Sequence, residues 1–290
     1  MDAQSAGRVA RSLDLLHAVS YFAPEVESRF RELGLEPGRM TYFAGRSAPM
    51  GAVGAGVVTS VFYNFNPDLV ATVIPKAWEL ASPRNVAAAR FAAVGEAFVR
   101  LLGDDVTSSP EMAEAAQLLA IAVDGIPGPE GRPLYAGHAD LDWPDTSHLA
   151  FWHGLTLLRE YRGDGHIAAL QTAGLSGLEA LITHTATGIG FEKTYARTRR
   201  GWTQDQWDAA VGGLQDRELI GRDGTLTGDG VELREVVEDL TDELSWAPWA
   251  NLGEEGVGRL LELAIPWRDT IVDAGAFPDG LFGARYGQSR

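Results

Sequence analysis

The chain has 290 residues, a formal charge of −16 from 24 basic and 40 acidic side chains, and no cysteine. The lack of cysteine excludes disulfide bonds, thiolate metal sites, cysteine-ligated iron–sulfur clusters and a cysteine nucleophile. Residues 126–290 carry 26 acidic and 14 basic side chains, a net charge of −12. A nucleic-acid-binding domain normally gathers Lys and Arg on one face, so this charge argues against strong DNA binding.

Length and apolar patterning predict two domains in a cytoplasmic protein. A domain usually has about 100–200 residues. Residues 1–11 are polar and lack the apolar core of a secretion signal. The longest apolar run, residues 118–123, is far shorter than the roughly 20 residues that cross a bilayer. We therefore expect no membrane partner.

Residues 1–125 are predicted to form a helical domain. Apolar residues at helical spacing predict helices over residues 6–20 and 24–34, followed by short helices over 40–46, 56–64 and 67–80. Ser82 and Ser109 each precede a proline, a pattern typical of an N-cap with Pro at the first helical position. They predict helices that end near residues 102 and 123. The Pro- and Gly-rich segment 126–146 is predicted to be a linker.

The second half predicts a winged-helix-like domain over residues 147–250. A helix is expected over 147–162 and a short helix from Asp164 to about 174. Capping-box patterns at Ser176 and Thr203 predict two later helix starts. Residues 219–227 contain Asp-Gly between β-prone ends and predict a short hairpin; helices follow near 230–244 and 254–272, and residues 251–290 form the C-terminal helix and tail. The fold class expected is therefore mostly all-α with one β-hairpin.

This order of elements resembles known families. Residues 150–245 resemble a MarR-type winged helix, with residues 202–219 as the recognition helix, 220–227 as the wing and 231–244 as the next helix. The chain also resembles an uncharacterised actinobacterial SalK-type family named for a helix-turn-helix domain, through the segments at 16–18, 21–24, 42–46, 62–65 and 159–166. The MarR resemblance implies a homodimer that responds to small molecules.

The N-terminal half concentrates aromatic residues, and His17 lies among them. On the first helix Asp14, His17 and Tyr21 are spaced i, i+3 and i+7 and share a face, so the Asp can orient the His for acid–base catalysis. Polar groups converging on apolar rings are typical of a small-molecule pocket. An ordinary aromatic core with a surface Asp–His pair is the alternative. The candidate ligand-binding residues are Tyr42, Phe43, Arg46, Phe62, Asn64, Trp143 and Trp152.

Other kinds of site have weaker support in the sequence. Arg46 could bind a carboxylate or phosphate, or form a structural salt bridge. Metal-ligand residue types cluster at His148, His153, Glu160, Asp164 and His166, but their spacing favours capping and packing over a metal site. Nucleotide-binding, serine-hydrolase and zinc-protease motifs are missing from the sequence, so no cofactor and no metal are predicted.

Three functions remain open. The first is a protein of specialised metabolism that binds a small, partly apolar molecule on a repurposed winged helix, with cofactor-free acid–base catalysis as its enzymatic form. The second is a MarR-like, ligand-responsive transcriptional regulator. The third is a non-catalytic carrier or interaction protein. Residues 201–246 carry 12 acidic and 3 basic side chains, so we expect only weak DNA binding at physiological salt.

Overall fold

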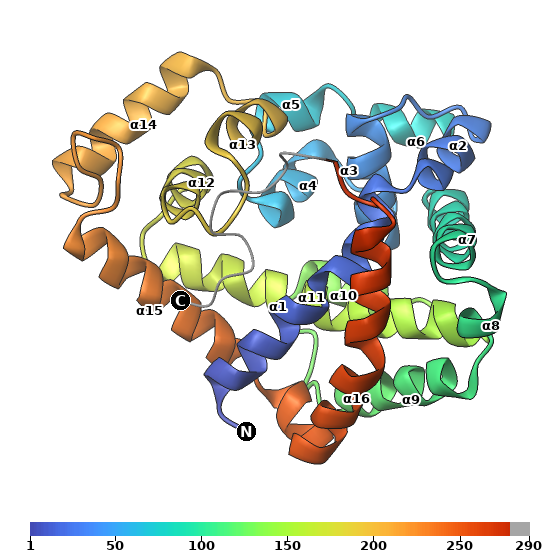
Figure 1. Ribbon diagram of the computed structural model, residues 1–290. Coiled ribbons are helices and arrows are strands. Elements are labelled where there is room, and N and C mark those ends of the chain that lie inside the picture. The colour runs from blue at the N-terminus through green and yellow to red at the C-terminus, as the bar shows by residue number, and fades with distance from the viewer. Residues whose placement is uncertain (279–290) are drawn as a thin grey trace.

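The computed structural model describes residues 1–278, and its regular structure is almost entirely helical (Figure 1). The prediction of a mostly helical protein is confirmed. The elements in chain order are α1 (Ala3–Phe22), α2 (Pro24–Glu32), α3 (Arg39–Ser47), the 3₁₀ turn η1 (Ala48–Met50), α4 (Ala55–Phe62), α5 (Pro67–Ala71), α6 (Lys76–Leu80), α7 (Pro83–Leu102), α8 (Asp104–Thr107), α9 (Pro110–Asp124), α10 (Pro133–Ala139), α11 (Ser147–Thr172), α12 (Gly177–Ala186), α13 (Lys193–Arg199), α14 (Gln204–Asp216), α15 (Gly228–Leu244) and α16 (Ala247–Asp273).

The predicted capping signals mark real helix starts. Ser82 and Ser109 accept hydrogen bonds from the third residue of α7 and α9, and both helices begin with the predicted proline. The capping boxes at Ser176 and Thr203 are both formed. These short-range signals are reliable because the capping side chain and the orphan N–H groups lie within one helical turn.

Three sequence predictions about local structure differ from the fold. The predicted helix over 67–80 is two short helices, with Pro75 as the N-cap of the second. Within residues 219–227, the expected hairpin is reduced to an antiparallel bridge between Ile220 and Leu226, and no strand is formed there. The predicted linker 126–146 contains α10, whose Leu134 and His138 are buried. The C-terminal tail beyond residue 278 lies outside the described residues.

Two hydrophobic cores share one long helix. The larger core unites the N-terminal helices with α16, which packs along α9 and α1. The smaller core lies among α12, α14 and α15. α11 contributes Phe151 and Trp152 to the larger core and Ala169 and Leu170 to the smaller one, and it crosses the middle of the molecule (Figure 1).

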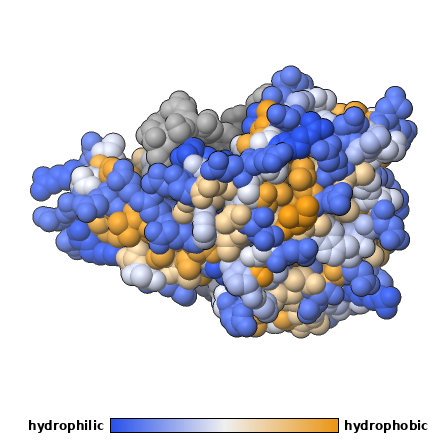
Figure 2. Space-filling view, turned by 90° about the horizontal axis from the view of Figure 1, so that it is seen from below, coloured by the Kyte–Doolittle hydropathy of each residue, from blue (hydrophilic) through white to orange (hydrophobic). Residues whose placement is uncertain are grey.

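One face of the molecule is covered mainly by hydrophilic residues (Figure 2). On the face that Figure 2 shows, hydrophobic residues lie in separate patches surrounded by hydrophilic ones. Among residues 1–278, no helix combines the length and apolar content needed to cross a bilayer.

Candidate functional site

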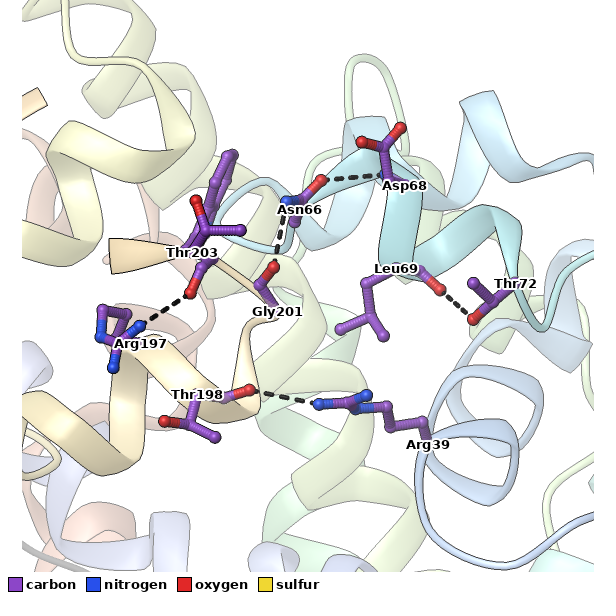
Figure 3. Close-up of a pocket in the computed structure, with 10 residues that line it drawn as sticks. Arg39, Asn66, Asp68, Leu69, Thr72, Arg197, Thr198, Gly201 and Thr203 are labelled. Atoms are coloured by element: carbon purple, nitrogen blue, oxygen red, sulfur yellow. Dashed lines mark hydrogen bonds between the residues drawn. The ribbon is translucent and has the colours of Figure 1, made fainter. Parts of the chain in front are cut away.

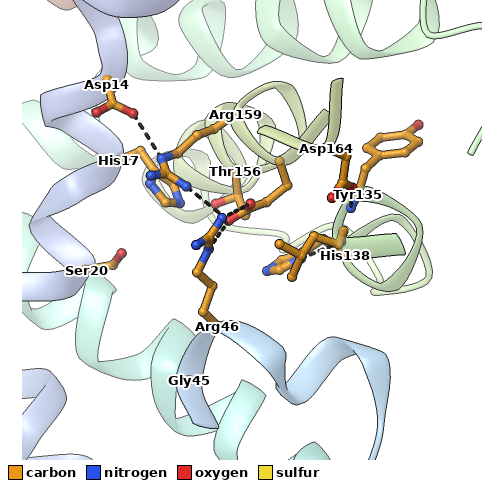
Figure 4. Close-up of polar contacts among 12 residues, drawn as sticks. Asp14, His17, Ser20, Gly45, Arg46, Tyr135, His138, Thr156, Arg159 and Asp164 are labelled. Carbon is orange, nitrogen blue, oxygen red and sulfur yellow. Dashed lines mark hydrogen bonds and ion pairs between the residues drawn. The ribbon is translucent and has the colours of Figure 1, made fainter. Parts of the chain in front are cut away.

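A buried chain of charges joins α1, α3 and α11 (Figure 4). Arg46 on α3 forms a two-pronged ion pair with Glu160 on α11, with Nε–Oε1 at 2.9 Å and Nη2–Oε2 at 2.7 Å. Arg159 contacts Glu160 Oε1 at 3.3 Å and Asp14 Oδ1 at 3.0 Å. Glu160 is fully buried, whereas the Asp14 side chain is 42% exposed. Arg46 therefore forms a buried salt bridge, one of the two roles the sequence left open.

The arginines of this site stabilise the ionised forms of the acidic groups Glu160 and Tyr42. Burial alone would raise the pKa of Glu160, but the neighbouring Arg46 guanidinium lowers it well below its usual range. Burial would likewise raise the pKa of Tyr42, yet Arg46 and Arg200 lower it overall. Glu160 is therefore a carboxylate at neutral pH, held by two arginines.

Arg90 on α7 adds a third buried cation. Its guanidinium donates to the carbonyl of Gly45 at 3.3 Å and to the hydroxyl of Ser20 at 3.4 Å, and it lies 3.3 Å from His138 Nε2. It also lies over the Trp152 ring, 4.9 Å from its centroid, at cation–π distance. Arg90 is only 4% exposed and forms no ion pair with a carboxylate in the described part of the chain. Positive charge is thus in excess here.

His17 is buried, and neither of its ring nitrogens has a hydrogen-bond partner in the described part of the chain. Its ring stacks on Trp152, with centroids 5.5 Å apart and planes inclined by 4°, and Tyr21 approaches edge-on. The Tyr21 hydroxyl also has no partner. The expected Asp14–His17 hydrogen bond is not formed, because Asp14 binds the Arg159 guanidinium instead. Burial lowers the pKa of His17 well below its usual value, so the ring is neutral at pH 7.

Most of the predicted aromatic residues come together around these charges. The Tyr42 ring lies 5.3 Å from Tyr21, and Arg46 stacks over the Phe62 ring at 4.7 Å. The rings of this cluster are those of Tyr21, Tyr42, Phe43, Phe62 and Phe65. We call this set, together with His17, Arg46, Arg90, Trp152, Arg159 and Glu160, the arginine–aromatic cluster.

Two of the predicted ligand-binding residues lie outside the arginine–aromatic cluster. Asn64 lies at its edge, where its side-chain oxygen accepts a hydrogen bond from Arg200 Nε at 3.2 Å. Trp143 is 39% exposed and packs against His153, with ring centroids 5.1 Å apart. Asn64 was predicted from its place among the N-terminal aromatic residues, and Trp143 from its place near the predicted domain junction, where clefts often form.

The space beside the arginine–aromatic cluster is small. A cavity of about 10 Å³ lies against Arg90, His138 and Trp152, with Pro49 and Leu141 among its other walls. A buried water needs about 10–15 Å³, so this cavity holds one water at most. η1 and α10 cover it, and a Cβ on Gly137 would lie only 3.0 Å from the Pro49 carbonyl. A larger ligand could enter only if this cover moved.

Arg90 is the main residue that sequence reasoning missed. It lies on α7 four residues after Val86 and four before Val94, so a cation interrupts the buried stripe of the helix. Lys, Glu, Arg and Asp are almost never fully buried unless paired. An arginine on an apolar stripe was therefore a readable signal for a buried polar site.

The second predicted cluster does not assemble into a metal site. The expected break before Asp164 is wrong, because α11 continues through it and Asp164 is not a helix cap. Asp164 Oδ2 instead accepts a hydrogen bond from the backbone N–H of Tyr135 at 3.0 Å. His166 Nδ1 lies 2.8 Å from the Thr241 hydroxyl. Among residues 1–278, no group of three potential ligands could hold a metal ion.

Asp164→Asn is expected to flatten the pH dependence of stability. Burial raises the pKa of Asp164 from 3.8 to about 7. Between these values the unfolded carboxyl ionises while the folded one keeps its proton, so wild-type stability falls as pH rises through this window. At about 1.4 kcal/mol per pKa unit, this loss amounts to about 4 kcal/mol by pH 8.

Urea denaturation at pH 5 and pH 8 measures this effect. The stability of Asp164→Asn relative to wild type should rise between the two pH values. The exposed Asp145→Asn should show no such rise. An equal pH dependence in wild type and Asp164→Asn would contradict the assignment of this titration to Asp164.

The smaller core contains consecutive helices joined by short turns. α13 and α14 meet at a turn in which Gly201 has a φ of 77°, a left-handed conformation that favours glycine. α14 is largely exposed and carries Asp205 and Asp208 near its start. Arg217, just after its end, is paired with Glu179 at 3.0 Å. The outer face of α14 is therefore acidic.

The turn between α13 and α14 is bonded to the N-terminal half. The Asn66 backbone N–H donates to the Arg200 carbonyl at 2.9 Å, and its side-chain amide donates to the Gly201 carbonyl at 3.0 Å. The Tyr63 hydroxyl donates to the carbonyl of Leu175, just before α12, at 2.6 Å. These bonds fix α12–α14 against α4 and α5, and we call them the docking contacts.

Comparison with known proteins gives one match. The sequence model of a family described as a helix-turn-helix family matches residues 6–278, which is nearly the whole chain. No curated protein and no solved structure matches it. The order of α12, α13 and α14 in the smaller core agrees with that description. The chain belongs to this helix-turn-helix family.

Proposed function

We propose that the protein binds a small organic anion with an aromatic or apolar part at the arginine–aromatic cluster. The observation that carries this proposal is Arg90, a buried cation that has no carboxylate partner among residues 1–278, near the nitrogens of His17 and the hydroxyl of Tyr21, which have no hydrogen-bond partner there either. Buried polar groups normally have hydrogen-bond partners, so several unpaired polar groups at one place favour a site that binds a ligand or a water. The excess positive charge favours a carboxylate over a neutral molecule.

The aromatic rings support the apolar part of this ligand. Trp152, Tyr21 and Tyr42 surround the charged groups with π faces and edges. A planar ring would stack there in the geometry that aromatic pairs prefer. Planar aromatic carboxylates are therefore the class we expect to bind, after movement of α10 and η1.

The proposal extends to cofactor-free proton transfer. A carboxylate bound beside His17 would raise the lowered pKa of its ring and so allow it to accept a proton, and the Tyr21 hydroxyl would donate a hydrogen bond to the anion that forms. Both groups are buried, which strengthens electrostatic interactions by excluding water. The catalytic roles of His17 and Tyr21 stay predictions, whereas Asp14 would act only by positioning Arg159.

We further propose that residues 147–250 are a MarR-type winged helix used as a scaffold. The order of α12, α13, α14, the Ile220–Leu226 bridge and α15 supports this view. The acidic face of α14 and the docking contacts support a structural role over reading DNA. A homodimer, implied by the same resemblance, stays a prediction.

His17→Phe is expected to abolish ligand binding without loss of stability. Phe keeps the stacking on Trp152 and removes two nitrogens that have no partner in the fold, so the folded state loses no hydrogen bond of the ring. Thermal denaturation with millimolar benzoate, salicylate or indole-3-acetate measures binding. We expect at least one acid to raise the midpoint of wild type and to leave His17→Phe unchanged.

His148→Phe is the matched control for this experiment. It makes the same chemical change at the start of α11, one turn before Trp152, where the His148 ring lies beside Gly95. This variant should respond to the acids like wild type. The proposal is wrong if none of the three acids stabilises wild type, or if His17→Phe responds fully.

A ligand-responsive DNA-binding regulator is the second candidate function, favoured by the family match. The basic residues Lys193, Arg197 and Arg199 on α13 also favour it, since they could contact phosphates. Against them stand the acidic side chains of α14, which would repel the DNA backbone.

We expect no specific DNA complex at about 0.15 M salt. Specific regulators typically hold their sites at about 10⁻⁸ M or tighter. A gel-shift assay with the DNA upstream of the gene itself measures this affinity. A sequence-specific complex in that range would make the regulator the leading function.

A further inference from the structure

A second cleft lies where the N-terminal half meets the turn between α13 and α14, and no residue of the arginine–aromatic cluster is among its walls (Figure 3). Its volume is about 490 Å³, within the roughly 300–1,000 Å³ of typical small-molecule sites. None of the residues that the sequence singled out as ligand-lining is among its walls. The function proposed above leaves this cleft unexplained.

Arginines flank the cleft on both sides. Arg39, at the start of α3, donates from Nη2 to the Thr198 carbonyl at 3.2 Å, and Arg197 donates from Nη1 to the Trp202 carbonyl at 3.2 Å. A guanidinium carries five N–H donors, so each arginine keeps donors for a ligand. The backbone contacts hold both side chains at the walls of the cleft (Figure 3).

The charge of the lining contrasts with that of the chain. The lining contains Arg39 and Arg197 but a single carboxylate, Asp68, so its formal charge is +1 while the whole chain carries −16. Arg199 and Lys193 lie on the same short helix as Arg197 and are exposed. A local positive site on an acidic protein attracts anionic ligands.

The remaining lining is mixed, with polar side chains beside the apolar surfaces of Leu69 and Trp202. The Thr198 hydroxyl can donate to an anionic oxygen, and the Asp68 carboxylate can accept a hydrogen bond from a ligand hydroxyl, whereas the Thr203 hydroxyl is already bonded to Gln206. Arginine forks match the geometry of phosphate oxygens, and two forks can bind several oxygens of one group. The cleft thus differs from the aromatic surroundings of His17.

We propose that this cleft binds a phosphate-bearing small molecule, held between Arg39 and Arg197. Because Arg39 belongs to α3 and Arg197 to α13, the bound ligand would link the N-terminal half to the helix-turn-helix helices. The ligand would reinforce the docking contacts made by Asn66. Its occupancy would therefore control how firmly α13 and α14 are held.

Inorganic pyrophosphate is the probe for this site, and fluorine NMR of protein labelled with 5-fluorotryptophan is the measurement. Trp202 lines the cleft, and its resonance is assigned by its loss in Trp202→Phe. We expect a saturable shift of this resonance with pyrophosphate in wild type. The double variant Arg39→Gln/Arg197→Gln should lose at least tenfold in affinity.

Matched controls separate this site from general effects. Arg31→Gln and Arg84→Gln remove two exposed arginines elsewhere and should leave the pyrophosphate titration unchanged. His17→Phe should also leave it unchanged, so the two proposals fail separately. The thermal midpoint of the double variant, measured without ligand, checks that it is folded; if it is unfolded, the single variants Arg39→Gln and Arg197→Gln replace it.

Three outcomes would overturn the proposal. The first is no shift of the Trp202 resonance at millimolar pyrophosphate. The second is an equal response to citrate, which would indicate an unspecific anion site. The third is a response to a 20-base-pair DNA duplex, with the same arginine dependence, that pyrophosphate does not reproduce; that result would assign these arginines to a DNA backbone.

Discussion

Replacing Glu160 by Gln is expected to lower the free energy of unfolding by about 3–5 kcal/mol at neutral pH. Glu160 is the fully buried carboxylate that binds both Arg46 and Arg159, and Arg90 lies close by without a carboxylate of its own. The variant would leave several buried cations without their main counter-charge. Urea denaturation of wild type and Glu160→Gln measures the difference.

Glu114→Gln is the matched control for Glu160→Gln. Glu114 forms a two-pronged pair with Arg259 at 2.8 Å, similar in geometry, but both side chains are more than 40% exposed. An exposed pair contributes about 0–1 kcal/mol because water screens it. Equal losses in the two variants would contradict a special role for the buried pair.

The contribution of Glu160 also has a defined pH dependence. Arg46 holds its folded pKa well below the 4.5 of an ordinary Glu, so the stabilisation is complete above about pH 4.5. It is lost as pH falls through the folded pKa. This loss on acidification is opposite in direction to the effect of Asp164, which removes stability as pH rises.

A carboxylate ligand should partly rescue the Glu160→Gln variant if the proposed function is right. The arginines left without Glu160 would then bind the added anion. Benzoate should raise the thermal midpoint of Glu160→Gln more than that of wild type. No rescue would weaken the case for an anionic ligand at this place.

Gly177→Ala is expected to destabilise the docking of α12 by about 1–3 kcal/mol or more. A Cβ at this position would lie 1.8 Å from the Tyr63 carbonyl oxygen, so backbone would collide with side chain. Relief requires α12 to move away from the α4–α5 connection, which would strain the Tyr63–Leu175 hydrogen bond. Hydrogen exchange of the Asn66 amide, which donates to the Arg200 carbonyl, should become faster.

Gly212→Ala provides the opposite expectation. Gly212 lies within α14 with nothing near its ideal Cβ, so alanine should stabilise the helix by about 0.5–1 kcal/mol. If Gly177→Ala were as stable as wild type, with unchanged exchange at Asn66, the close docking of α12 would be wrong.

Local signals in the sequence predicted local structure well. The Ser-Pro starts of α7 and α9 and the capping boxes of α12 and α14 involve residues within one turn, and all are formed. The aromatic residues around Tyr42 were also singled out, because their types and spacing favour burial together.

Contacts between residues far apart in the sequence were not predicted. Spacing placed Asp14 and His17 on one face of α1, but Arg159, 145 residues away, binds Asp14 instead. Asp164 between two glycines is typical of a helix start, yet it lies within the continuous α11 and accepts a hydrogen bond from the backbone N–H of Tyr135 on α10. Partners so distant in sequence leave no periodic signal, so only the fold can reveal them.

The continuous α11 connects the two hydrophobic cores as one rigid helix. Its 26 residues span about 39 Å at 1.5 Å per residue, and its two ends belong to different cores. A tilt of about 5° around its middle would carry each end through about 2 Å. Ligand entry beside Trp152 and Glu160 that tilted α11 would then displace Ala169 and Leu170 in the smaller core, with no unfolding of the helix between them.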